Sequence, residues 1–312
     1  MEKISKNKNL HDANKAKNDE FYTQLSDIER ELKHYKNHFK DKVVYCNCDD
    51  PRVSNFFRFF VLNFEEFGLK KLITTCYKNQ NPNMFSQHDS EKAIYLEYDG
   101  NKTGNNMPDF MDSAIKHLES DGDFRSKECI ELLKQVDIVV TNPPFSLFRE
   151  YVAQLIEYDK KFLIIGNMNA ISYKEIFPLI KENKLWLGVV SGAKKYIKPD
   201  GTFQNMGNTC WFTNLEHKSR NAELMLQGSF YSPEKHPKYD NYDAIEIGKV
   251  TDIPEDFDGV MGVPISFLDK YNPKQFEIVG LDRYAEGNTM PNRRMHINGK
   301  EIYARILIKR KK

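Results

Sequence analysis

The sequence lacks an uninterrupted apolar run of about 18 residues, the length that a membrane-spanning helix requires. Residues 1–20 are polar and contain no apolar core of the kind that a secretory signal has. These two absences predict a cytoplasmic protein that does not enter a membrane.

Cysteine is scarce as well, because the chain of 312 residues has only five. This number is odd and far below the density of a disulfide scaffold, so we expect free thiols in a reducing compartment. Cys46 and Cys48 alternate along an apparent strand, and no second Cys or His pair follows at zinc-like spacing. We therefore expect small buried side chains here and no metal site.

An excess of one charge is also missing, since 46 Lys and Arg face 45 Asp and Glu. A uniformly basic surface is thereby excluded, and any face that binds a polyanion must be local. The chain is rich in large apolar groups, with 21 Phe and 16 Tyr. Such a composition predicts a sizeable buried core.

Apolar segments with the look of strands alternate with segments of helical spacing over the first two thirds of the chain. This pattern predicts an α/β fold with a Rossmann-like, doubly wound and mostly parallel sheet, which collects ligands at the carboxyl ends of its strands. We expect a flexible basic arm over residues 1–18, a catalytic domain over 19–220 and a smaller region of short strands over 221–312. The expected strands are KVVYCNC, KKLITTCY, VDIVVTN, KKFLIIGN and KLWLGVV.

A rigid tetrapeptide, Asn142, Pro143, Pro144 and Phe145, follows the expected strand VDIVV. The prolines lack N–H groups and fix φ, so the Pro143 carbonyl points in one direction beside the neutral side-chain carbonyl of Asn142. We call these two oxygens the acceptor pair. They suit the two N–H groups of a planar amine on a heterocycle, and Phe145 can stack on its ring.

Such an amine is a poor nucleophile, because its lone pair is delocalised into the ring. Hydrogen bonds to the acceptor pair would favour a pyramidal nitrogen and aim the lone pair at an electrophile. A strong general base is unnecessary, because the alkylated nitrogen is acidic. The competing interpretation is a simple turn that ends a strand.

In context the chain resembles the EcoRI-type adenine-specific DNA methyltransferase family. The similarity extends over nearly the whole chain from about residue 18. The stretches that carry it, in order, are DEFYTQ, VVYCNCDDPRVSNFF, DIVVTNPPFSLF, FLIIGNMNA and DGVMGVPISFLDKYNPKQFEIVG.

The resemblance implies transfer of a methyl group from S-adenosylmethionine to N6 of a flipped adenine in double-stranded DNA. It also implies that three further stretches, besides Asn142, contact the cofactor. Each stretch has a structural alternative: a helix-entry staple for the first, a helix cap for the second and a surface turn for the third. Relatives carry glycines after the first strand, which this chain lacks, so the choice between the two aspartates stays open. The residues are Phe21, Tyr22 and Thr23, then Asp49 and Asp50, then Asp123 and Phe124.

For the target base, the resemblance implies an aromatic wall from Trp211 or Phe212, with a core role as the alternative. Arg293 and Arg294 are candidates for DNA contacts, together with Arg283 and Arg305. We expect a monomer that forms no stable complex with a cognate restriction endonuclease, if one exists. The recognition sequence does not follow from the residues.

Two other functions fit the same tetrapeptide. An RNA or protein-glutamine N-methyltransferase presents a similar amine to the acceptor pair. A decayed nucleic-acid-binding protein would explain the glycine-poor loop CNCDDP.

Overall fold

The computed structural model describes residues 22–78, 93–100, 115–191, 195–197, 203–205, 207–226, 230–288 and 294–311. The chain divides into two compact units. The first comprises Met1–Glu175 and Val190–Leu215, and the second Ile176–Val189 and Glu216–Lys312. Within the described ranges, no helix combines the length and apolarity needed to cross a bilayer.

The first unit is built on a mixed sheet, which confirms the predicted α/β class. Its four central strands run parallel and are ordered β3-β2-β6-β7, whereas β4 and β5 at one side and β11 at the other run antiparallel to their neighbours. The full order is β5-β4-β3-β2-β6-β7-β11-β8, and residues 186–189 of β8 belong to the second unit. The bounds are β2 Val43–Asn47, β3 Lys71–Cys76, β4 Ile94–Tyr98, β5 Lys116–His117, β6 Ile138–Thr141, β7 Lys161–Asn167, β8 Trp186–Ser191 and β11 Thr209–Thr213.

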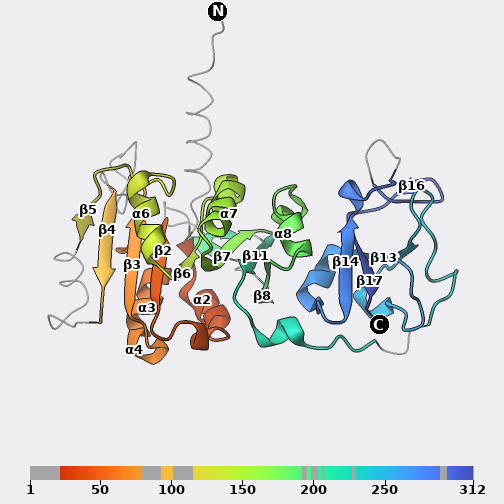
Figure 1. The fold of residues 1–312 in the computed structure, drawn as a ribbon, viewed down its shortest axis with the longest axis horizontal. Coiled ribbons are helices and arrows are strands. Elements are labelled where there is room, and N and C mark those ends of the chain that lie inside the picture. Colours follow the sequence, from red (N-terminus) through yellow and green to blue (C-terminus); the bar gives the residue numbers. More distant parts are fainter. Residues whose placement is uncertain are drawn as a thin grey trace, which may run out of the picture. The chain divides into compact units, whose positions relative to one another are not determined.

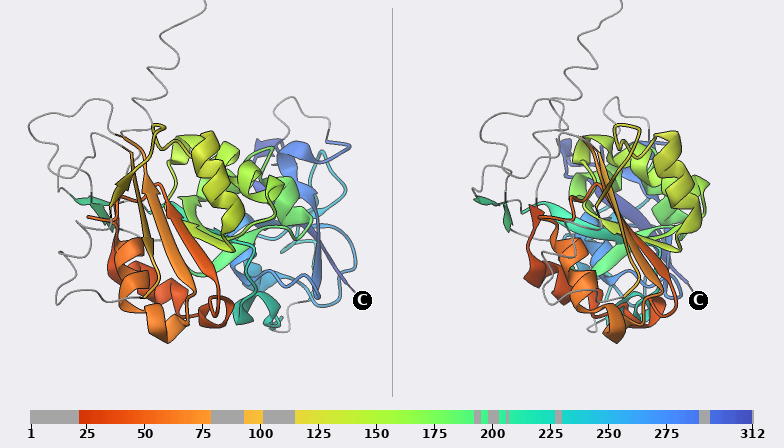
Figure 2. Two further views of the ribbon diagram at one scale, coloured as in Figure 1. Left: turned by 60° about the vertical axis from the view of Figure 1, so that its left-hand side comes forward. Right: turned by 90° about the vertical axis from the view of Figure 1, so that its left-hand side faces the viewer.

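Helices cover both faces of this sheet (Figure 2). On one face lie α2 (Leu25–Leu32), α3 (Asn55–Leu62) and α4 (Phe64–Phe67), and on the other lie α6 (Lys127–Gln135) and α7 (Phe148–Glu157). Because both faces are covered, the central parallel strands are buried along most of their length, and Val44, Val139 and Ile164 are fully buried.

The direction of strand addition reverses at β2, which lies between β3 and β6 (Figure 1). The chain adds β3 on one side of β2 and later returns to add β6 on the other side. β2 pairs with β6 only at Val44↔Ile138 and Tyr45↔Val139, so the two strands separate before their carboxyl ends. Ligands in sheets of this kind bind at such a reversal.

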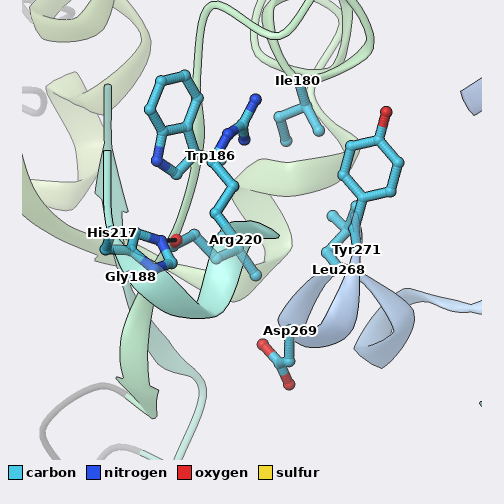
Figure 3. Close-up of a pocket in the computed structure, with 9 residues that line it drawn as sticks. Ile180, Trp186, Gly188, His217, Arg220, Leu268, Asp269 and Tyr271 are labelled. Atoms are coloured by element: carbon cyan, nitrogen blue, oxygen red, sulfur yellow. Dashed lines mark hydrogen bonds between the residues drawn. The ribbon is translucent and has the colours of Figure 1, made fainter. Parts of the chain in front are cut away.

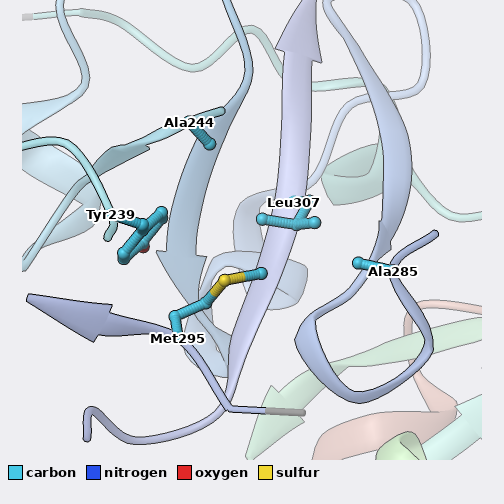
Figure 4. Close-up of a cluster of buried hydrophobic side chains, with 5 residues drawn as sticks. All are labelled: Tyr239, Ala244, Ala285, Met295 and Leu307. Carbon is cyan, nitrogen blue, oxygen red and sulfur yellow. The ribbon is translucent and has the colours of Figure 1, made fainter. Parts of the chain in front are cut away.

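The second unit contains a four-stranded sheet of order β12-β13-β17-β14. A cluster of five buried side chains packs in this unit: Tyr239, Ala244, Ala285, Met295 and Leu307 (Figure 4). The strands are β12 (Ile245–Glu246), β13 (Met261–Pro264), β14 (Phe276–Leu281) and β17 (Arg305–Arg310), and a hairpin joins β15 (His296–Ile297) to β16 (Lys300–Glu301).

Two smaller elements complete the description. The helix expected over YKEIFPLIKEN is the short α8 (Phe177–Lys181) in the second unit, and it begins just before Pro178 because proline is tolerated only in the first helical turn. A three-stranded sheet joins β1 (Tyr22–Thr23), β9 (Lys195–Ile197) and β10 (Phe203–Asn205).

Candidate active site

The tetrapeptide lies at the carboxyl end of β6, beside the reversal in strand order. Asn142 follows Thr141 directly, and its Oδ1 atom is buried. Pro143 is buried, and Pro144 has φ −55° and ψ 126°, which keeps the backbone extended before the 3₁₀ turn Phe145–Leu147 begins. Phe145 is partly exposed. The backbone is therefore extended at Pro144, and the side-chain oxygen of Asn142 is buried; the acceptor pair itself stays a prediction.

The neighbouring strand end contributes a buried carboxyl group. Asp49 follows β2, and its Oδ2 atom lies 2.5 Å from Oγ1 of Thr141. The same hydroxyl group contacts the backbone oxygen of Asn47. Ser54, at the start of α3, donates to Oδ1 of Asp49 at 2.8 Å. The loop after β2 is thereby joined to the residue that precedes Asn142.

Burial raises the pKa of Asp49 to about 7, against the opposing effect of its hydrogen bonds with Thr141 and Ser54. The carboxylate of Asp50 faces a different partner, since it accepts bonds from the backbone N–H and the guanidinium of Arg52 at 2.5–3.2 Å. The two aspartates of the loop are therefore distinct: Asp49 contacts β6, and Asp50 is paired with a cation.

Cys48 provides a left-handed turn in the loop after β2. Its φ is 66°, a left-handed conformation that non-glycine residues rarely adopt. The backbone turn expected of a glycine is present here in a cysteine. This turn could not be predicted from the residues, because cysteine has no preference for the left-handed conformation.

An aromatic group packs behind the same strand ends. The Tyr151 hydroxyl, from α7, donates to Oδ1 of Asn47. The Phe124 ring lies 5.0 Å from the Tyr151 ring in an edge arrangement, and Gln154 binds the Phe124 carbonyl at 3.1 Å. Phe124 is 5% exposed, so its face is largely covered.

Asp123 is partly exposed and paired with Arg125 through bonds of 2.7 and 2.9 Å. Burial would raise the pKa of Asp123, but the bonds to Arg125 outweigh it and lower the pKa below its usual value. A carboxylate has about four acceptor positions, so the pair leaves room for another donor.

Phe21 of the N-terminal motif lies outside the described residues. Tyr22 and Thr23 form β1, and the Thr23 carbonyl accepts a bond of 2.7 Å from Asn55 at the start of α3. Among the residues that the structure describes, Oγ1 of the buried Thr23 has no hydrogen-bond partner. A buried hydroxyl of this kind suits a bound polar ligand.

The predicted aromatic wall is not exposed in this structure. Trp211 and Phe212 lie on β11, and both are fully buried. Trp211 packs edge-on against Phe56 at 6.0 Å, and Phe212 packs against Phe148 at 4.9 Å. Their burial supports the alternative of a core role.

The arginines considered for DNA contacts are largely engaged within the second unit. Arg294 pairs with the fully buried Asp282 at 3.1 Å, and Arg305 binds Glu246 through several bonds of 2.5–3.0 Å. Arg293 and the basic arm lie outside the described residues. Arg283 is exposed.

The second unit also contains a small pocket (Figure 3). Arg220 stacks on the Trp186 ring at 3.6 Å and donates to Asn183 at 3.0 Å. The cavity is about 20 Å³, room for about one water molecule, so it does not fit an organic ligand. In the described part of the chain, no group of His, Cys, Asp and Glu is arranged to hold a metal ion.

Sequence reasoning missed three residues that join the strand ends: Asn47, Thr141 and Tyr151. Their letters are ordinary for a strand or helix, and only the sheet order brings them together. The alternation of strands and helices did predict that β2 and β6 end at the same edge.

The structure places Asn142 and Pro143 at the end of one parallel strand and the carboxyl group of Asp49 at the end of its neighbour. Comparison with known proteins then identifies the family. The chain belongs to the family described as adenine-specific methyltransferase EcoRI, which matches residues 9–311.

Three relatives show the same similarity over the full length. The chain is 50% identical to the Type II methyltransferase M.EcoRI of Escherichia coli over 330 aligned positions, covering 100% of this chain and 99% of the relative. It is 41% identical to Type II methyltransferase M.MpnI of Mycoplasma pneumoniae and 38% identical to Type II methyltransferase M.MgeORF184P of Mycoplasma genitalium. Each of these two comparisons covers 96% of this chain and 97% of the relative. No solved structure matches the chain.

Proposed function

We propose that this enzyme transfers a methyl group from S-adenosylmethionine to the N6 amine of a flipped adenine in double-stranded DNA, at a specific site. The observation that best supports this is the position of Asn142 and Pro143 at the reversal in strand order, next to the buried Asp49. The names of the relatives place them in Type II systems, so we expect a cognate endonuclease that acts on the same site.

We also propose that the first unit has the Rossmann-like, doubly wound arrangement, based on its central parallel strands and the helices on both faces. We also propose that residues 19–220 form the catalytic domain and residues 221–312 the target-recognition region, a division that differs from the two compact units because residues 176–189 and 216–220 belong to the second unit.

The residues near the strand ends fit the proposed cofactor. Asp49 and Asp50 offer carboxyl groups for an ammonium group, and the buried Thr23 hydroxyl is available to its carboxylate. Asp123 and Phe124 are assigned to the adenine end, where the carboxylate would accept from the amine while it stays bound to Arg125. When bound, S-adenosylmethionine supplies the methyl electrophile.

The acceptor pair orients the target amine. The side-chain oxygen of Asn142 and the carbonyl oxygen of Pro143 accept its two N–H groups, and Phe145 stacks on the base. The prolines keep this geometry fixed in the absence of DNA, because neither can join a ladder or a helix through an N–H group. Flipping costs a few kcal/mol of unstacking, part of which Phe145 recovers.

The test is to express the chain in a methylation-free host and to map modified adenines by long-read sequencing. N6-methyladenine at one short motif is the expected result. Unmodified adenine at every motif, from soluble folded protein, would overturn the DNA assignment. Purified enzyme with labelled S-adenosylmethionine and duplex DNA, RNA or protein then separates the three substrate classes.

A further inference from the structure

The hydroxyl group of Thr141 lies between two oxygen atoms. One is the backbone oxygen of Asn47, which never carries a proton, and the other is Oδ2 of Asp49, 2.5 Å away. Thr141 has a single hydroxyl proton, which can be donated to only one of them. Two full hydrogen bonds therefore need a second proton, which a protonated Asp49 would supply.

The need for this arrangement follows from the sheet. β2 and β6 are paired at Val44↔Ile138 and Tyr45↔Val139 and then separate. Beyond that point the Thr141 side chain takes over as donor to the Asn47 carbonyl. A protonated Asp49 donates to Thr141, Thr141 donates to Asn47, and Ser54 donates to the other oxygen of Asp49. Every donor in this series of hydrogen bonds then has an acceptor.

The surroundings also oppose a negative charge on Asp49. It is 8% exposed, and Asp50 on its own loop is an acidic neighbour that raises its pKa further, whereas Cys46 on β2 and Tyr151 on α7 stay neutral because burial raises the pKa of each. Burial and the proximity of Asp49 raise the pKa of Cys46. Arg52 is bound to Asp50. A buried anion at Asp49 is therefore favoured only when a cation arrives beside it.

We propose that Thr141 is a positioning residue that shares a proton with Asp49 in the cofactor-free enzyme, and that this proton leaves when the cofactor's ammonium group binds. This inference rests on the proposed function, since it takes the cofactor to be cationic. The O–H bond of Asp49 breaks, the proton passes to solvent water, and the carboxylate that remains pairs with the ammonium group. The Thr141 proton then turns from Asn47 to Asp49, so cofactor binding is transmitted to the residue before Asn142.

Calorimetry of S-adenosylmethionine binding in two buffers of different ionisation enthalpy measures the released protons directly. The pKa of Asp49 in the cofactor-free enzyme is about 7. Cofactor binding should therefore release about half a proton at pH 7, nearly one at pH 6 and little at pH 8.5. Asp49→Asn should abolish the release. Asp137→Asn, at the other end of β6, should keep it, since it leaves Asp49 and Thr141 intact.

Two variants of Thr141 separate a positioning role from a merely structural one. Thr141→Val removes the bond that favours the carboxylate, so the pH midpoint of proton release should rise. Thr141→Ser should restore the wild-type midpoint. An unchanged midpoint in Thr141→Val, or the same release in Asp49→Asn as in the wild type, would overturn the proposal.

An infrared measurement decides the case even if the cofactor does not bind. The cofactor-free enzyme should show the carbonyl band of a protonated carboxylic acid at pH 6 that disappears by pH 8.5 and is missing in Asp49→Asn. A band missing from the wild type would refute the shared proton. Absence of cofactor binding with the band present would refute the proposed function and the proton release coupled to it, while the proton shared by Asp49 and Thr141 would stand.

Discussion

Gly166 on β7 lies against the ring of Phe148, the first residue of α7. A Cβ atom at Gly166 would come within 2.5 Å of Cε2 of Phe148, closer than real contacts allow. Phe148 is fully buried and follows the tetrapeptide by three residues. The absence of a side chain at Gly166 therefore sets how closely the start of α7 approaches the sheet.

Gly166→Ala should push Phe148 outward and displace the turn that contains Phe145. We expect the free energy of unfolding to fall by about 1–3 kcal/mol, the usual cost of overpacking. The rate of methyl transfer should fall as well, even in the fraction of protein that stays folded. Chemical denaturation and a methyl-transfer assay measure the two effects. Gly248→Ala is the matched control, because a Cβ there meets nothing within 4 Å. Equal behaviour of the two variants would contradict the packing argument.

Cys48 should tolerate glycine better than a branched side chain. Its left-handed φ of 66° costs a non-glycine residue about 1–2 kcal/mol. In Cys48→Gly, relief of this strain should offset the stability lost because glycine makes the unfolded chain more flexible. Cys48→Val should lose about 1–3 kcal/mol, and Cys48→Ala controls for loss of the thiol. The free energy of unfolding in urea distinguishes them. A valine variant as stable as the glycine variant would rule out backbone strain.

Asp49 should make stability depend on pH. Its native pKa is about 7 against an ordinary value of 3.8, so between these values the folded state holds a proton that the unfolded state has lost. Stability from this group is therefore greatest below pH 4 and falls as the pH rises to about 7. Asp49→Asn should raise the melting temperature at pH 8 more than at pH 5, because the wild type buries a charged carboxylate at pH 8. The neutral amide avoids this cost and can still donate to Thr141. Equal shifts at both pH values would contradict the raised pKa.

Arg305 should be a structural residue of the second unit. Its side chain is 12% exposed and that of its partner Glu246 is 11% exposed. Arg305→Met leaves the Glu246 carboxylate buried without its cation, at a cost of about 3–5 kcal/mol. Arg283→Met, at an exposed position, should change stability by less than about 0.5 kcal/mol. Denaturation curves of the two variants decide, and equal stability would place Arg305 on the surface in solution.

Much of the first unit could be predicted from sequence, because apolar strands buried on both faces alternate with helices. KVVYCNC, KKLITTCY, VDIVVTN and KKFLIIGN all contain strands at the expected places. Their parallel order could be inferred, but not the antiparallel direction of β11, since a fully buried strand has the same letters in either direction.

The site was predictable where chemistry is written in consecutive residues and less so where it depends on folding. Asn142 and Pro143 were assigned from the tetrapeptide alone. The contact of Thr141 with Asp49 joins residues 92 positions apart, and no local pattern indicates it. Trp211 has the type of side chain that stacks on bases. Both faces of its strand are covered, however, and only the structure shows that it is buried.

The central claim is that Asn142 orients the target amine, and the initial rate of N6-methyladenine formation in duplex DNA tests it most directly. Asn142→Ala should lower this rate by at least about 100-fold while the protein stays folded, because an interaction specific to the transition state is lost. Ser146→Ala, an exposed neighbour in the same turn, is the control and should stay near the wild-type rate. A rate for folded Asn142→Ala equal to that of the wild type would contradict the account.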